Sequence, residues 1–266
     1  IGVRLVGSEM CIRDRPKQVI GKSLQVHTEK NGFPELENTR IAFFGVSESR
    51  NSYYPVMEYD TNSFRKEFYQ LFPGNWSVNV ADLGDLPSGE KPEDTYYALK
   101  EICLYLRQLN IIPIVLGGSQ DLTVSLYRSF ESSDQWVNIV SVDNRFDFSQ
   151  EEELISGRSY MSEIIIENPS RLNNFTNLGY QSYLIAQEEL DLMEKLFFDS
   201  QRLGQVLDRP ENTEPVFREA DLVSFDMKVL SGVAEGNLSQ GMPNGIDART
   251  ICCLLYTSPS PRDGLL

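Results

Sequence analysis

Charged side chains follow three apolar runs of the chain at the points where each run ends. The three junctions read LGGSQDLT, SVDNRFDF and SFDMKVLSG, and they span Leu116–Thr123, Ser141–Phe148 and Ser224–Gly232. Carboxylates gathered at such ends can bind metal ions or exchange protons, depending on how they converge. These junctions therefore hold the candidate functional residues.

The second and third junctions carry their charges at alternate positions. Asp143, Arg145 and Asp147 form one alternating set. Asp226 and Lys228 form the other. Residues two apart on an extended segment point the same way, so we expect each set to converge.

The first junction gives a weaker signal. Its two glycines permit a tight turn into a helix, whose free N–H groups could hold an anion. Asp121 in the first helical turn would compete with that anion. A plain strand–helix turn capped by Ser119 is an equally good interpretation.

Alternating strands and helices surround these junctions and must position them. The expected strands are Arg40–Val46, Trp76–Leu83, Ile111–Leu116, Val137–Asp143, Tyr180–Ala186 and Asp221–Asp226, with Glu163–Glu167 as a further candidate. Helical patterns occupy Phe64–Phe72, Glu93–Asn110, Asp121–Phe130 and Gln187–Leu207, and polar loops are expected at Ser149–Ser156 and Arg209–Glu219. This alternation predicts a three-layer α/β/α fold with a mainly parallel sheet, in which chemistry sits at the carboxyl ends of the strands.

The order of the three junctions resembles the signatures of the ureohydrolase superfamily, which includes arginase, agmatinase and formimidoylglutamase. Its members carry GG-x-H, D-x-H-x-D and S-x-D-x-D motifs that bind two manganese ions and a bridging hydroxide. That hydroxide attacks a guanidino or formimino carbon. The resemblance runs at least from Arg40 to Gly245, where GMPNG (Gly241–Gly245) is similar to a glycine/proline-rich loop of the family. It implies an arginase-like fold.

Only half of the family's metal ligands are retained. Matched residue by residue, Asp143, Asp147 and Asp226 keep their places. The replacements are Gln120 and Arg145 for two histidines, Lys228 for an aspartate, and Tyr160 for the substrate-contacting histidine in the run SGRSYMS. The chain has a single histidine, His27, which is far from all three junctions in sequence.

These replacements argue against the family's two-metal chemistry. Arg145 cannot ligate a metal because it stays protonated, and Lys228 could do so only when neutral. Three convergent carboxylates without metal would repel one another unless they were paired. We therefore hypothesise that Arg145 and Lys228 replace the two Mn²⁺ ions of active relatives as counter-charges. We expect no metal cofactor in this degenerate site.

The resemblance with lost ligands implies a non-catalytic relative, a pseudoenzyme that acts as a scaffold for a small ligand or a protein partner. Two enzymatic alternatives stay open. One is a manganese-dependent hydrolase of guanidino or formimino C–N bonds. The other is an enzyme of altered chemistry that uses one of the three aspartates, or Tyr160, as an acid or base without metal. Relatives often form homo-oligomers, so a homo-oligomer is also expected.

Both ends of the chain resemble translations of one sequencing-library adapter. LVGSEMCIRDR and CLLYTSPSPRD can arise from opposite strands of a single oligonucleotide read in different frames. We expect residues 1–15 and 253–266 to be adapter-derived scars that carry no information on the fold. Residues 16–252 are then expected to be a single arginase-like domain of a metagenomic fragment, incomplete at both ends and lacking the C-terminal part of the fold.

Composition narrows the partners and the compartment. The formal net charge of −15 argues against nucleic acid or an anionic membrane as a partner. No apolar run approaches the roughly 18 residues that a membrane span needs. Without the scars, Cys103 and Cys252 remain and indicate no disulfide framework, which is typical of a cytoplasmic protein.

Overall fold

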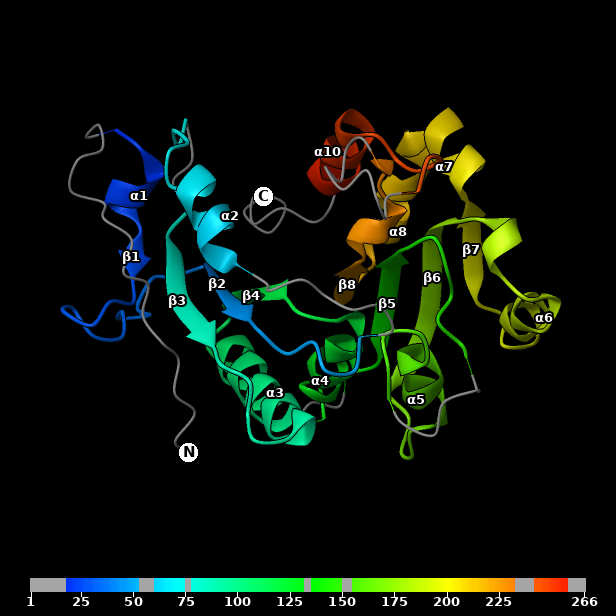
Figure 1. The fold of residues 1–266 in the computed structure, drawn as a ribbon, viewed down its shortest axis with the longest axis horizontal. Helices are drawn as coiled ribbons and strands as arrows, with labels where there is room; N and C mark the ends of the chain where they lie inside the picture. The colour runs from blue at the N-terminus through cyan, green and yellow to red at the C-terminus, as the bar shows by residue number, and fades with distance from the viewer. Residues whose placement is uncertain are drawn as a thin grey trace. The chain divides into compact units, whose positions relative to one another are not determined.

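The chain folds into two compact units, Ile1–Ser129 and Phe130–Leu266, each with its own four-stranded sheet (Figure 1). The computed structural model describes residues 18–52, 60–74, 78–131, 135–149, 155–232 and 242–257. All strand pairs within the two sheets are parallel, as strand–helix alternation predicts. No helix in the described residues is both long and apolar enough to span a membrane.

The first unit has the strand order β1-β3-β2-β4. Its strands are β1 (Gln25–Val26), β2 (Ile41–Val46), β3 (Val80–Leu86) and β4 (Ile112–Gly117). Its helices are α1 (Ile20–Ser23), α2 (Thr61–Phe68), α3 (Pro92–Gln108), the 3-10 helix η1 (Gln120–Leu122) and α4 (Thr123–Arg128).

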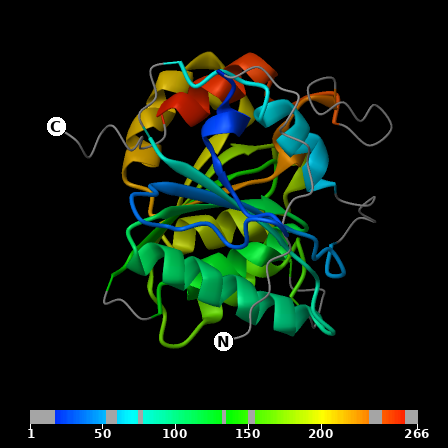
Figure 2. The same cartoon turned by 90° about the vertical axis from the view of Figure 1, so that its left-hand side faces the viewer.

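Successive side chains of β2 point to opposite faces of the first sheet. Phe43 meets Phe64 and Phe68 of α2, with ring centroids 5.8 and 5.4 Å apart. The next residue, Phe44, is buried in a cluster that includes Leu99 of α3. Because successive strand residues point to opposite faces, α2 and α3 cover opposite sides of this sheet, as Figure 2 shows.

A buried arginine ties α2 to β3. Arg65 is fully buried, and its Nε lies 2.7 Å from Oδ2 of Asp82. Its Nη1 lies 2.8 Å from Oδ2 of Asp85, and Tyr69 also donates a hydrogen bond to Asp82. A buried guanidinium is tolerable here because two carboxylates compensate its charge.

The second unit has the strand order β7-β6-β5-β8. Its strands are β5 (Val137–Val142), β6 (Leu172–Tyr180), β7 (Asp199–Arg202) and β8 (Leu222–Phe225). Its helices are α5 (Tyr160–Ile166), η2 (Ser182–Leu184), α6 (Gln187–Lys195), α7 (Leu203–Asp208), η3 (Pro210–Thr213), α8 (Glu214–Arg218), η4 (Met227–Val229) and α10 (Ala248–Thr257).

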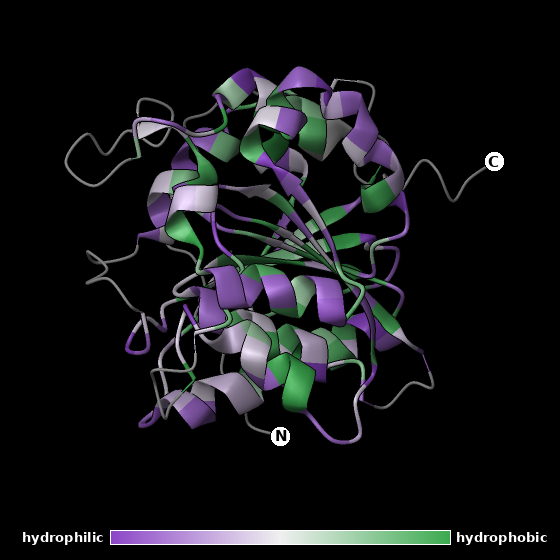
Figure 3. Ribbon diagram, turned by 90° about the vertical axis from the view of Figure 1, so that its right-hand side faces the viewer, coloured by the Kyte–Doolittle hydropathy of each residue, from purple (hydrophilic) through white to green (hydrophobic). Residues whose placement is uncertain are grey.

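Strand β5 is the centre of the second unit's packing. Val140 and Val142 are buried in an apolar cluster with Phe217 of α8 and Leu254 of α10. On the other face of β5, Ser141 Oγ lies 3.3 Å from the hydroxyl of Tyr160, which begins α5. Helices therefore cover both faces of this sheet (Figure 3).

Several predicted strands are confirmed and three need correction. β2, β4, β5 and β8 lie where the apolar runs predicted them. The prediction of a strand at Tyr180–Ala186 was wrong, because the strand there is β6, which ends at Tyr180. The candidate strand Glu163–Glu167 is instead largely helical, since it lies at the end of α5. The strand predicted at Trp76–Leu83 begins only at Val80, and Trp76 lies outside the described residues.

A helix is present in each predicted segment, but the one expected at Phe64–Phe72 is α2, which begins at Thr61 and ends at Phe68. The segment Gln187–Leu207 contains α6 and α7 but also β7 between them, a short and largely polar strand. The expected loop Arg209–Glu219 folds as η3 and α8. Most of the predicted terminal scars lie outside the described residues, and α10 continues to Thr257. Gly241 of the predicted GMPNG loop also lies outside them.

Candidate functional site

Two of the three retained aspartates follow neighbouring strands at one edge of the second sheet. β5 and β8 pair in parallel, with Val142 opposite Phe225. The next residues along the two strands are Asp143 and Asp226. The backbone N–H of Asp226 donates to the carbonyl of Val142 at 3.0 Å. Adjacent strands thus deliver both carboxylates to the edge where α/β folds place their ligands.

Asp143 is buried, and only one of its carboxyl oxygens is satisfied. Its Oδ1 accepts a hydrogen bond from the backbone N–H of Arg145 at 3.0 Å. Its Oδ2 has no hydrogen-bond partner among the described residues. Burial, followed by the negative charges of Asp147 and Asp226, raises the pKa of Asp143 well above its ordinary value. The negative charges of Asp147 and Asp226 are therefore close enough to Asp143 to disfavour its ionised form.

Asp147 is buried on a left-handed backbone, with φ at 58°. Aspartate tolerates this conformation better than most residues. Burial is the main reason that the pKa of Asp147 rises to about 7, and the charge of Asp226 adds to the increase. Asp143, Lys228 and Arg145 act in the opposite direction. Near neutral pH the site therefore avoids carrying three full negative charges.

The two cations at family ligand positions behave differently. Lys228 Nζ lies 3.7 Å from Oδ2 of Asp226, whose side chain is only 13% exposed. Arg145 donates a hydrogen bond from Nη1 to the backbone carbonyl of Leu184. Its positive charge lowers the pKa of Asp147 without an ion pair between the two side chains among the described contacts. Lys228 is thus a direct partner of the aspartate trio, and Arg145 is an indirect one.

Two asparagine side chains donate hydrogen bonds to the backbone carbonyls of these two cationic residues. Nδ2 of Asn144 donates to the carbonyl of Lys228 at 2.9 Å. Nδ2 of Asn177 donates to the carbonyl of Arg145 at 2.7 Å, and Asn177 itself is fully buried. Sequence reasoning missed Asn177 because it placed a strand after β6 instead of at β6. A polar residue in the middle of a buried strand is the signal that could have found it.

Tyr160 and Gln120 are the two remaining candidate residues. Tyr160 is fully buried, with its hydroxyl beside Ser141, and it does not line the cavity near Arg145. Gln120 opens η1 in the first unit, directly before the buried Asp121. The three aspartates and the two cations all belong to the second unit, whereas Gln120 belongs to the first.

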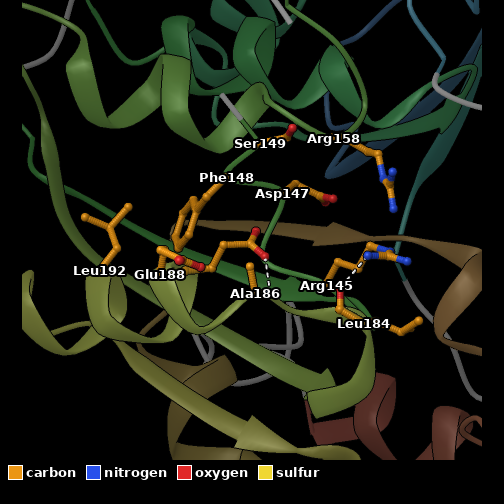
Figure 4. Close-up of a pocket in the computed structure, with 10 residues that line it drawn as sticks. Arg145, Asp147, Phe148, Ser149, Arg158, Leu184, Ala186, Glu188 and Leu192 are labelled. Carbon is orange, nitrogen blue, oxygen red and sulfur yellow. Dashed lines mark hydrogen bonds between the residues drawn. The ribbon is translucent and has the colours of Figure 1, made fainter. Parts of the chain in front are cut away.

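A cavity of about 410 Å³ opens beside this constellation (Figure 4). Arg145 and Asp147 line it together with Phe148, and Arg158 contributes a second guanidinium. Its remaining walls include Leu184, Glu188 and Leu192. The volume is within the range of small-molecule sites, which combine apolar walls with a few placed polar groups.

The donor set does not fit the two-metal centre that the resemblance implies. Among the described residues, no three His, Cys, Asp or Glu side chains are arranged to hold a metal ion. The trio offers carboxylates without an imidazole, and the ammonium group of Lys228 lies against Asp226. Two dications about 3.5–4 Å apart need more ligands than this.

Comparison with known proteins agrees with this architecture. The model of the arginase family matches residues 39–254, whereas no curated protein sequence gives a significant match. Formimidoylglutamase from Bacillus subtilis subsp. subtilis str. 168 is similar over 98% of this chain and 85% of its own, with a TM-score of 0.76 and 15% identity.

Two further solved structures share the fold. Trypanosoma cruzi formiminoglutamase with Mn²⁺ has a TM-score of 0.74 and 15% identity, over 84% of this chain and 81% of its own. The agmatine ureohydrolase of Thermoplasma volcanium has a TM-score of 0.69 and 20% identity, over 84% and 79%. Because the family model spans most of the sequence, the chain belongs to the arginase family.

Proposed function

We propose that this protein is a non-catalytic member of the arginase family that binds a small ligand beside the former metal site. The observation that carries the proposal is the ion pair between Lys228 and Asp226, at 3.7 Å. An ammonium group in this place supplies the positive charge that a dication would supply. It also repels any dication that approaches the same carboxylate.

The chemistry of the replacements supports the same conclusion. A metal-bound hydroxide forms at neutral pH because dications lower the pKa of water, and a lysine or arginine side chain has no comparable effect. A guanidinium group has no free lone pair with which to bind or activate a water molecule as a metal ion does. Without that nucleophile, the three aspartates can orient or discriminate a ligand but lack the attacking group of the family reaction.

A small ligand is a better candidate than a protein partner because of the cavity beside Arg145. Its volume of about 410 Å³ suits a molecule of amino-acid size. A cytoplasmic location belongs to the same proposal, since Cys103 is buried and unpaired.

The test is to measure manganese and turnover together on the purified 266-residue chain. After dialysis against Mn²⁺ and then against buffer, elemental analysis should find far less than one Mn²⁺ per chain. Urea or formamide release from arginine, agmatine or formiminoglutamate should stay at the level of a protein-free blank. Near-stoichiometric manganese with turnover would refute the proposal.

A manganese-dependent hydrolase remains the second candidate, and one observation favours it. Oδ2 of the buried Asp143 has no hydrogen-bond partner among the described residues, and a cation would satisfy it. The same experiment separates the two candidates, because this one requires both bound manganese and product release.

A further inference from the structure

The cavity beside Arg145 separates its charges between two sides. Figure 4 shows Arg145 and Arg158 on one side of the cavity and Glu188 on the other. Asp147 lies on the side of the arginines, so that side carries two guanidinium groups against one carboxyl group. One end of the cavity therefore favours an anion and the other favours a cation.

Within the described part of the chain, Arg145 retains most of its hydrogen-bonding capacity. Its guanidinium group has five N–H donors in a planar fork, and Nη1 gives one hydrogen bond to the carbonyl of Leu184. This bond fixes the direction of the side chain. The remaining donors can bind a carboxylate, for which the planar fork has the matching geometry. Arg158 lines the same side of the cavity and adds a second fork.

The opposite side presents one carboxylate that pairs with no other residue described in the structure. Glu189 is engaged at the start of α6, where its Oε2 accepts a hydrogen bond from the backbone N–H of Ala186 at 2.9 Å. Glu188 is exposed and has no hydrogen bond or ion pair among the described residues. The apolar side chains of Leu184 and Leu192 also line the cavity. They suit a short aliphatic chain between two charged ends.

We infer that this cavity binds a small zwitterion, with its carboxylate held by Arg145 and Arg158 and its ammonium group held by Glu188. The ligand class is an ω-amino acid, in which a short alkyl chain separates the two charges. The inference deepens the proposed function and rests on it, because a resident dication would reverse the charge beside Asp147.

The test uses three five-carbon probes that differ only in their end groups. Isothermal titration calorimetry on the full chain compares 5-aminopentanoate, glutarate and 1,5-diaminopentane at pH 7.5 in the presence of a chelator. 5-Aminopentanoate should bind at least tenfold more tightly than either of the other two. Equal or tighter binding of glutarate or the diamine, or no binding of any probe, would overturn the inference.

Variants locate the two ends of the ligand. Arg158→Gln and Glu188→Gln should each weaken 5-aminopentanoate binding at least tenfold, whereas Arg209→Gln and Glu211→Gln, on the exposed surface, should leave it unchanged. Glu188→Lys should reverse the preference in favour of glutarate. Unchanged binding in both Gln variants within the cavity would contradict the assignment. Binding of no probe by a chain that also lacks manganese and turnover would refute this inference alone, whereas turnover with manganese would refute the proposed function.

Discussion

Replacing Asp147 with asparagine is expected to stabilise the protein at alkaline pH. The carboxyl group is buried, and its pKa of about 7 compares with an ordinary value of 3.8. That difference corresponds to about 4 kcal/mol of folding free energy once the group is ionised in both the folded and the unfolded chain. Asparagine has the same shape, tolerates the left-handed backbone at this position and has no charge to bury.

The direction of the pH dependence follows from the raised pKa. A carboxyl group with a raised pKa favours the folded state most at pH values below 3.8, and this contribution is lost as the pH rises to 7. The benefit of Asp147→Asn should therefore grow with pH. Between pH 5 and pH 8 the increase should be about 3 kcal/mol.

Urea unfolding followed by circular dichroism measures this effect. Unmodified protein and Asp147→Asn are compared at pH 5 and pH 8 with a chelator present. Asp208→Asn is the matched control, because the side chain of Asp208 is 79% exposed and should show no pH-dependent difference. A variant that is less stable than the unmodified protein at pH 8 would refute the reasoning. It would mean that the ionised carboxylate is stabilised, as a bound cation would do.

Three further variants test the residue matching and two other ion pairs. The triple variant Gln120→His, Arg145→His and Lys228→Asp should gain Mn²⁺ binding by calorimetry, and a folded triple variant without binding would contradict the residue matching. Arg65→Met should lower the free energy of unfolding in urea by about 3–5 kcal/mol, because it leaves two aspartates without their counter-charge; a loss below about 1 kcal/mol would contradict that role. Glu48→Gln should destabilise the protein at pH 7 but progressively less as the pH falls below 4.5. The guanidinium of Arg50 donates a hydrogen bond to Glu48 and lowers the pKa of that carboxyl group. The contribution of Glu48 to stability is therefore lost on acidification. A difference that stays constant from pH 7 to pH 3 would speak against this.

The parts of the fold that could be predicted from the sequence are those with a simple hydrophobic pattern. β2 and β4 are continuous apolar runs, and α3 carries its buried residues on one helical face. β6 escaped detection because polar residues such as Asn177 interrupt it, and the hydrogen bond from Asn177 Nδ2 to the distant carbonyl of Arg145 partly offsets the cost of burying that side chain. Three consecutive isoleucines suggested a strand at the end of α5, where tertiary packing overrides local preference.

The candidate site was predictable only where it follows strand ends. Asp143 and Asp226 could be placed together because parallel strands end at one edge of the sheet. The cavity's Arg158 and Glu188 come from segments that carry no strand-end signal. Their approach depends on how the loop before α5 and the start of α6 pack, which no local pattern encodes.

The most direct test of charge replacement is anomalous diffraction at the manganese edge from crystals grown in excess Mn²⁺. We predict no anomalous peak among Asp143, Asp147 and Asp226, and electron density for the ammonium group of Lys228 against Asp226. A manganese peak within ligand distance of these carboxylates, with Lys228 turned away, would contradict the account.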